Sequence, residues 1–139
     1  MNTRTFALLF GIVFLAVGVL GFVPGMVHPP MGDHDVTMTQ NYGDLLGLFP
    51  VNLLHNVVHI IFGLWGLAAS RSLGGSIGYA RAVAVIYALL TVLGLLDATN
   101  TTFGLIPIYG NDVWLHAVLA LVAAYFGWVH RNAARTDAL

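Results

Sequence analysis

The sequence has no cysteine and few charged residues among its 139 positions. Without cysteine, the chain cannot form a disulfide scaffold, a thiolate metal site, a thiol nucleophile or a lipoprotein anchor. Charged residues make up 8% of the chain, whereas a soluble domain carries about a quarter. The five basic residues are too few and too scattered for the basic surface that nucleic-acid binding needs, so we expect no nucleic-acid partner. With 58% hydrophobic residues and a mean hydropathy of +0.85, the composition is that of a protein that faces the lipid bilayer.

Familiar catalytic patterns are also missing. The two residues that follow His55 and Asn56 are valines, so there is no H-E-x-x-H motif with its general-base glutamate. The chain has no Walker loop, no G-x-S-x-G motif and no pair of intramembrane carboxylates suited to a proton relay. These absences disfavour a hydrolase or an NTPase, and on balance the sequence favours a protein that is not an enzyme. Redox chemistry by a bound cofactor stays open.

Four apolar stretches are each about long enough to cross a bilayer. A helix that rises 1.5 Å per residue needs roughly 20 apolar residues to cross a hydrocarbon layer about 30 Å thick. We therefore predict an all-α membrane protein, a single domain over residues 1–139, folded as a four-transmembrane-helix bundle of two tandem helical hairpins. The predicted spans are residues 5–23, 52–69, 79–96 and 113–129, with outer loops at 24–51 and 97–112.

Details at the span ends support this division. The first span is longer than the apolar region of a secretory signal and no small-x-small cleavage site follows it, so we expect it to be retained. Asn52 and Asp112 are the expected N-caps of the second and fourth spans. A polar, glycine-rich turn at residues 70–81 joins the second span to the third.

The arginines orient the four spans. All five fall on one side of this layout, and the two loops on the other side contain no lysine or arginine. The positive-inside rule then puts both termini and the middle turn in the cytoplasm. The five residues are Arg4, Arg71, Arg81, Arg131 and Arg135.

Two similar segments organise the chain. GLFPVNLLHNVVH covers residues 47–59, and GLIPIYGNDVWLH covers residues 104–116. Each contains Gly-Leu, a proline, an asparagine and a final histidine, and each leads into an apolar span. If the copies superpose, His55 and His116 hold equivalent places one turn into the second helix of each hairpin. His59 then lies one turn further along, on the same face as His55.

These histidines are the candidate functional site. Ionisable residues within membrane spans are rare and usually face the bundle interior, which makes them functional candidates. Three imidazoles that converge from His55, His59 and His116 could bind a transition metal such as copper, zinc, nickel or iron. Two of them on separate helices could instead be the axial ligands of a haem.

Other polar residues could support such a site. Hydrogen bonds from neighbouring groups fix the tautomer and orientation of a ligand histidine. The candidates for this role are Asn52, Asn56 and Asp97. Residues of the first outer loop that could feed or cap the site are His28, Asp33, His34 and Asp35.

The histidines also have a purely structural interpretation. Neighbouring asparagines, backbone carbonyls or lipid head groups could satisfy their hydrogen bonds. Small residues that recur along the spans would let helices pack closely. The alternative is therefore a structural or accessory subunit of a larger membrane complex, without catalysis of its own, or a homo-oligomer. A solute carrier or channel would need oligomerisation, because four helices leave little room for a pore.

The segment NLLHNVVH and the later GNDVWLH resemble a family of small bacterial four-helix membrane proteins known only as a domain of unknown function. The resemblance extends over nearly the whole chain, from FALLFGIVFL in the first span to WLH at the start of the fourth. It implies a multi-pass protein of the bacterial inner, cytoplasmic membrane and brings no established activity. The general layout is also similar to that of quinone-linked DoxX and DoxD subunits, by analogy of fold alone.

Overall fold

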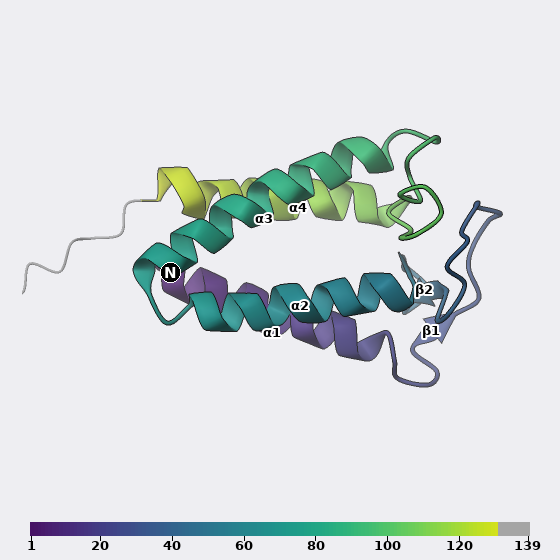
Figure 1. The fold of residues 1–139 in the computed structure, drawn as a ribbon, viewed down its shortest axis with the longest axis horizontal. Coiled ribbons are helices and arrows are strands. Elements are labelled where there is room, and N and C mark those ends of the chain that lie inside the picture. Colours follow the sequence, from purple (N-terminus) through teal and green to yellow (C-terminus); the bar gives the residue numbers. More distant parts are fainter. Residues whose placement is uncertain (131–139) are drawn as a thin grey trace, which may run out of the picture.

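The computed structural model describes residues 1–130, which form four helices and one small sheet (Figure 1). The predicted cytoplasmic residues Arg131 and Arg135 lie outside the described residues. The helices are α1 (Thr3–Leu20), α2 (Leu53–Ala69), α3 (Leu73–Gly94) and α4 (Asn111–Ala124), and α4 continues into the π-helical turn η1 (Tyr125–Val129). The strands are β1 (Val27–His28), β2 (Gly43–Leu45) and β3 (Phe49–Val51).

The chain is mostly helical, and its helices suit a membrane. In residues 1–130, three are long and apolar enough to cross a bilayer, namely α1, α3 and α4 with η1. Helix α2 is also apolar but has 17 residues. The exposed side chains along all four helices include many large apolar ones, such as Ile12, Leu64, Val85 and Leu121. In water a protein with such a surface would aggregate, whereas in lipid the exposure of these apolar side chains carries no free-energy penalty.

The helices pack in two pairs, α1 against α2 and α3 against α4 (Figure 1). Glycines bring α1 and α2 very close together. A Cβ atom added at Gly66 would lie 2.8 Å from the Cα atom of Gly11, and one added at Gly11 would lie 2.9 Å from the carbonyl oxygen of Gly63. Only glycine fits at such separations, so these positions set the distance between the two helices.

The second helix pair buries the same positions as the first. Between α1 and α3, the matching buried residues are Thr3 and Ser76, Phe6 and Tyr79, Ala7 and Ala80, Gly11 and Ala84, and Phe14 and Tyr87. Between α2 and α4, they are His55 and Asp112, His59 and His116, Gly63 and Ala120, and Gly66 and Ala123. The spacing between matching positions is constant along each helix, so the two pairs share one pattern of buried positions.

This match corrects one sequence expectation. The equivalent of His116 is His59, and the equivalent of His55 is Asp112. The two repeated segments have the same length, so an ungapped match keeps the helical register. Pairing His55 with His116 shifts one copy by four residues, about one turn, which keeps nearly the same helix face but displaces equivalent positions along the helix axis.

The first outer segment is not only a loop, so the all-α prediction misses a small sheet. Strands β1, β2 and β3 pair antiparallel in that order, with Gly43 opposite Val51 and Val27 opposite Leu45. Every residue of β2 is buried. The sheet covers the outer ends of α1 and α2 and delivers the chain to Asn52, where α2 begins.

Two predicted helix starts also differ from the structure. Helix α3 begins at Leu73, well before residue 79, because Ser72 caps it by accepting a hydrogen bond from the Gly75 N–H. The turn between α2 and α3 is therefore much shorter than residues 70–81. The expected capping role of Asp112 is wrong, since Gly110 occupies the N-cap position of α4 without a side-chain hydrogen bond. Asn52 does cap α2, as predicted.

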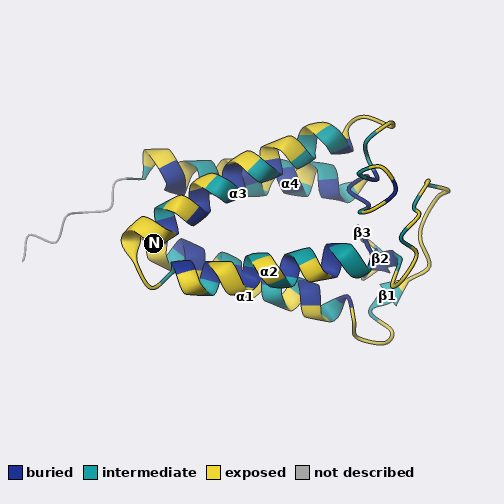
Figure 2. Cartoon of the chain, in the orientation of Figure 1, coloured by how far each residue is buried: buried dark blue, intermediate teal, exposed yellow. Residues whose placement is uncertain are grey.

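An aromatic core fills the inner half of the helical region, where buried residues line the facing sides of the helices (Figure 2). Phe6 stacks on Phe126 with ring centroids 4.8 Å apart. Phe14 stacks on Tyr87 at 5.5 Å, across the boundary between the two helix pairs. These rings close the space between the pairs below the histidines.

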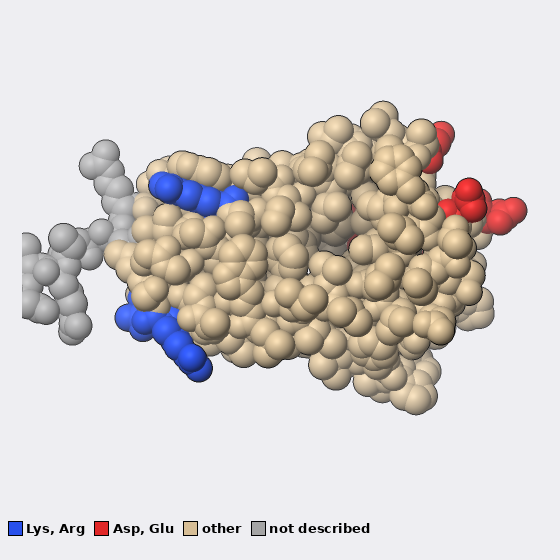
Figure 3. Space-filling model, in the orientation of Figure 1, with Lys and Arg blue, Asp and Glu red and all other residues tan. Residues whose placement is uncertain are grey.

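Charge separates along the long axis of the molecule (Figure 3). The exposed basic residues at one end are Arg4, Arg71 and Arg81. The exposed acidic residues at the other end are Asp33, Asp35 and Asp97. The long apolar surface lies between these two ends.

Candidate functional site

Four ionisable side chains meet between the two helix pairs, near the acidic end. His55 and His59 come from the first turns of α2, and Asp112 and His116 come from the first turns of α4. All four are buried, with exposed fractions of 5%, 8%, 3% and 2%. Because the residues are four apart on each helix, both members of a pair project from the same face.

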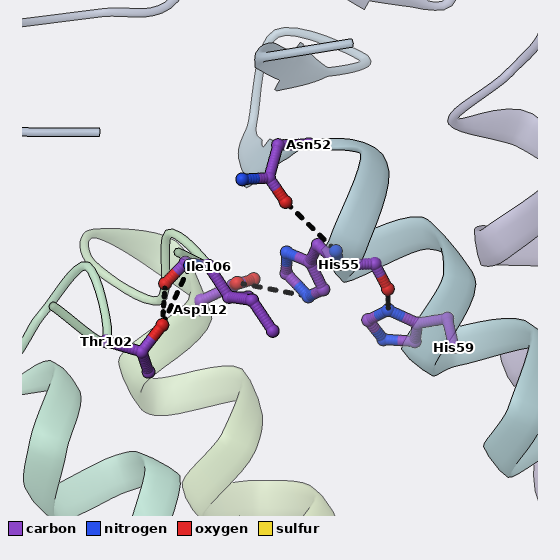
Figure 4. A network of polar contacts seen from close by, with 6 residues as sticks. All are labelled: Asn52, His55, His59, Thr102, Ile106 and Asp112. Atoms are coloured by element: carbon purple, nitrogen blue, oxygen red, sulfur yellow. Dashed lines mark hydrogen bonds and ion pairs between the residues drawn. The ribbon is translucent and has the colours of Figure 1, made fainter. Parts of the chain in front are cut away.

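The closest contact across the pairs joins His55 and Asp112. The His55 Nε2 atom lies 3.8 Å from Asp112 Oδ2, and Figure 4 shows the imidazole turned toward the carboxylate. One ligand atom each from His55, Asp112 and His116 lies within 4.8 Å of the other two. We call these three residues the His–Asp–His cluster.

His59 lies beside this cluster rather than in it. Its Nδ1 atom is 3.1 Å from the carbonyl oxygen of His55, and its ring stacks on that of His55 with centroids 4.6 Å apart (Figure 4). Phe14 also contacts the His59 ring at a centroid distance of 5.6 Å. Tyr87 meets the His116 ring edge-on at 4.9 Å. The same Phe14–Tyr87 stack therefore supports one histidine of each helix pair.

The cluster contains buried polar atoms that have no hydrogen-bond partner among the described residues. They are Nδ1 of His55, Oδ2 of Asp112 and Nδ1 of His116. Leaving a buried polar atom unpaired costs about 1–3 kcal/mol, and more when the group is charged. A folded protein keeps such atoms together where they serve a bound group or a function.

Asn52 fixes the start of α2 at this site. Its Oδ1 accepts a hydrogen bond from the His55 N–H at 2.9 Å. Its amide nitrogen donates to the carbonyl oxygens of Met38, at 3.0 Å, and Leu105, at 2.7 Å. Through these bonds one side chain ties both outer segments to the turn that carries His55. On the opposite side, the Thr102 hydroxyl and backbone groups of Ile106 close the loop that leads to Asp112 (Figure 4).

Two predicted supporting residues lie elsewhere. Asn56 is fully buried, but it faces the end of α1, where a Cβ atom at Gly21 would overlap its amide group. Asp97 is exposed and shares an outer polar pocket with Asp33, His34 and Asp35. The carboxylate beside the histidines is therefore that of Asp112. A sequence signal for it existed, because the ungapped match of the two segments places Asp112 at the position of His55.

An aromatic group joins the two outer segments. His34 stacks on Tyr109 with centroids 3.6 Å apart, and the hydroxyl oxygens of Tyr109 and Tyr42 are 2.7 Å apart. Burial, together with the hydrogen bond to Tyr42, raises the pKa of Tyr109 above its ordinary value. The Tyr109 hydroxyl group is therefore neutral over the physiological range and can donate a hydrogen bond.

The fold and the cluster together define a class: a small, mostly helical protein with apolar surfaces suited to lipid and a buried group of histidine and aspartate side chains. The chain belongs to the family described as domain of unknown function DUF4383, whose model matches residues 4–129. This result confirms the resemblance to a family of unknown function. No curated protein and no solved structure matches the chain.

Proposed function

We propose that the protein is a four-span integral membrane protein of the bacterial inner membrane, with both termini in the cytoplasm. Helix α2 packs along α1, so when α1 crosses the bilayer its 17-residue partner must cross with it. The paired packing of α1 with α2 and of α3 with α4 supports the predicted bundle of two tandem hairpins. Exposed arginines at one end favour that end as cytoplasmic. Helical spans are typical of the inner membrane, since outer-membrane proteins are β-barrels.

Within this bundle, we infer that the His–Asp–His cluster binds a divalent transition metal. The observation that carries the proposal is that three buried ligating side chains converge within 4.8 Å while a polar atom of each lacks a hydrogen bond. A metal ion would bind an oxygen of the Asp112 carboxyl group and one nitrogen of each imidazole ring. His59, which the sequence nominated as a ligand, would instead orient His55 through their stacked rings.

The donor set narrows the choice of metal. Two imidazole nitrogens and one carboxylate oxygen suit zinc, and the same combination with open positions is typical of non-haem Fe(II). Metal–ligand bonds of about 2.0–2.1 Å place tetrahedral ligand atoms roughly 3.4 Å apart. The His55–Asp112 separation of 3.8 Å is close to that value, and the three ligand atoms lie within 4.8 Å of one another, so the side chains would have to move closer together around a bound ion.

Haem is the weaker form of the hypothesis. The cavity beside the histidines has a volume of about 180 Å³, whereas pockets for ligands of drug size are roughly 300–1,000 Å³. A porphyrin between His55 and His116 would also have to separate rings that now lie close together. A single ion needs no such rearrangement.

The test is to measure metal content and visible absorption of the purified protein, with and without added Zn²⁺ or Fe²⁺. We expect about one equivalent of metal in the wild type and a loss of at least tenfold in affinity in His55→Ala and His116→Ala. The exposed His28 provides a matched control, and His28→Ala should bind as the wild type does. Metal-free wild-type protein that stays metal-free after loading would refute the proposal, and a Soret band lost in His116→Ala would show haem instead.

A second candidate is an accessory subunit of a larger membrane complex. A groove between α3 and α4, with a volume of about 440 Å³, is lined mainly by small residues on the surface that faces lipid, among them Ala84, Ala88, Ala117, Ala120 and Ala124. A neighbouring helix could pack closely there. Stoichiometric co-purification of a partner that is lost in Ala88→Phe, with no bound metal, would favour this function over the first.

A further inference from the structure

A partly enclosed cavity lies against the histidines, between α1 and α4, with a volume of about 180 Å³. Its side walls are apolar residues of these two helices, and its outer wall comes from β2, β3 and the turn between them. The lining residues from α1 and α4 that the argument uses are Phe14, Val17, Leu115 and Leu119.

One wall of this cavity is chemically different from the others. His55, His59, Asp112 and His116 form it, and all are at least nine-tenths buried. Three of these residues carry the unpartnered polar atoms described above. A buried apolar space with polar groups gathered on one side matches the usual design of a small-molecule site.

The cavity has a way in from the lipid. Val13 on α1 and Leu46 beside β2 both line it, and they are 53% and 52% exposed. These exposed side chains lie on the outer half of the apolar surface. A ligand dissolved in the bilayer would therefore reach the cavity between α1 and α4 without crossing the aromatic core.

We propose that this cavity binds one lipid-soluble aromatic ring that carries a hydroxyl group, a phenol in the chemical sense. Its volume is close to the roughly 150 Å³ of an apolar cavity that accommodates benzene. Phe14 and the imidazole rings offer flat faces against which an aromatic ring packs well. The hydroxyl group would donate a hydrogen bond to an imidazole nitrogen of the histidine wall.

Charge excludes other lipid-soluble ligands. Each neutral imidazole offers one N–H donor and one acceptor nitrogen, and the Asp112 carboxyl group offers acceptor oxygens, so a ligand group that both donates and accepts can pair with this wall. A fatty acid carboxylate or a phospholipid phosphate would bring an uncompensated negative charge into this buried site, because the described arginines all lie at the opposite end of the bundle. An uncharged hydroxyl group meets both conditions. The proposal extends beyond the metal hypothesis and does not require a bound metal.

The test uses metal-free protein, prepared with a chelator in detergent, and follows 4-fluorophenol by ¹⁹F NMR. We expect saturable binding that unlabelled phenol displaces. Fluorobenzene, which has the same ring without the hydroxyl group, should bind at least tenfold more weakly. Metal content is measured separately, so a failure of the metal hypothesis leaves this result independent.

Cavity-filling variants locate the binding site. Leu119→Phe and Val17→Phe each fill the cavity from a different helix, and both should abolish saturable binding. The matched controls make the same substitutions on the lipid-facing side of the same helices, at Leu121, which is 72% exposed, and Val19, which is 52% exposed. If one cavity variant fails to fold, the other decides. Uptake by the wild type that only rises linearly, equal binding of fluorobenzene, or unchanged binding in the folded cavity variants would overturn the proposal.

Discussion

The sharpest test of the metal site is Asp112→Asn. The substitution keeps the shape of the side chain but removes the only carboxylate of the His–Asp–His cluster. A structural zinc site is worth about 10–16 kcal/mol in binding free energy, shared by four ligands, so one ligand supplies roughly 3 kcal/mol. Because 1.4 kcal/mol is a factor of ten, the affinity of Asp112→Asn for zinc should fall about 100-fold.

This loss becomes a difference in thermal stability. Zn²⁺ at about 1,000 times its dissociation constant stabilises a folded protein by roughly 4.1 kcal/mol. At the same concentration, a variant that binds about 100-fold more weakly gains only roughly 1.4 kcal/mol. For a chain of this size 1 kcal/mol shifts Tm by about 4 °C, so zinc should raise Tm by about 16 °C in the wild type and about 6 °C in Asp112→Asn.

The assay is thermal unfolding of the purified protein in detergent, with and without Zn²⁺, followed by circular dichroism. Asp97→Asn is the control, because Asp97 is exposed and lies in a different pocket. It should keep the full zinc-dependent shift. The reasoning fails if Asp112→Asn keeps that shift, or if Asp97→Asn loses it.

Two further predictions concern the bundle itself. Gly66→Ala should lower Tm, because its new Cβ atom would lie 2.8 Å from the Cα atom of Gly11 and 2.9 Å from the Ala7 carbonyl oxygen. The control is Gly78→Ala, whose new Cβ atom would have nothing within 4 Å, so its Tm should stay unchanged or rise. A Tm that falls equally in both variants would contradict the packing argument. Because the chain has no cysteine, a single introduced cysteine reports which side of the membrane its position faces. In intact cells, a maleimide that cannot cross the membrane should label Asp33→Cys but not Arg71→Cys. The reverse pattern would show that the arginine-rich end faces outward.

The sequence alone determined the class and the main polar residues. Few charges and long apolar runs make a helical membrane protein the physical solution for this chain, because backbone groups in lipid must be hydrogen-bonded within a helix. The Asn52 cap was also predictable, since asparagine before an apolar run is a strong N-terminal signal. The repeated Gly-Leu-x-Pro segments identified the two places where the candidate histidines lie, at the starts of α2 and α4. All of this information is local or periodic along the chain.

Only the tertiary structure decided which of these residues meet. Asp112 carries the same sequence signal as a helix cap, and its place opposite His55 depends on how the α3–α4 pair lies against the α1–α2 pair. Asp97 precedes α4 in the same outer segment, yet the path of the loop leaves it exposed. The small sheet was hidden too, because its strands are only two or three residues long and β1 pairs with a strand well beyond it in the sequence. Such contacts depend on helix rotation and loop path, which a single sequence does not encode in any local pattern.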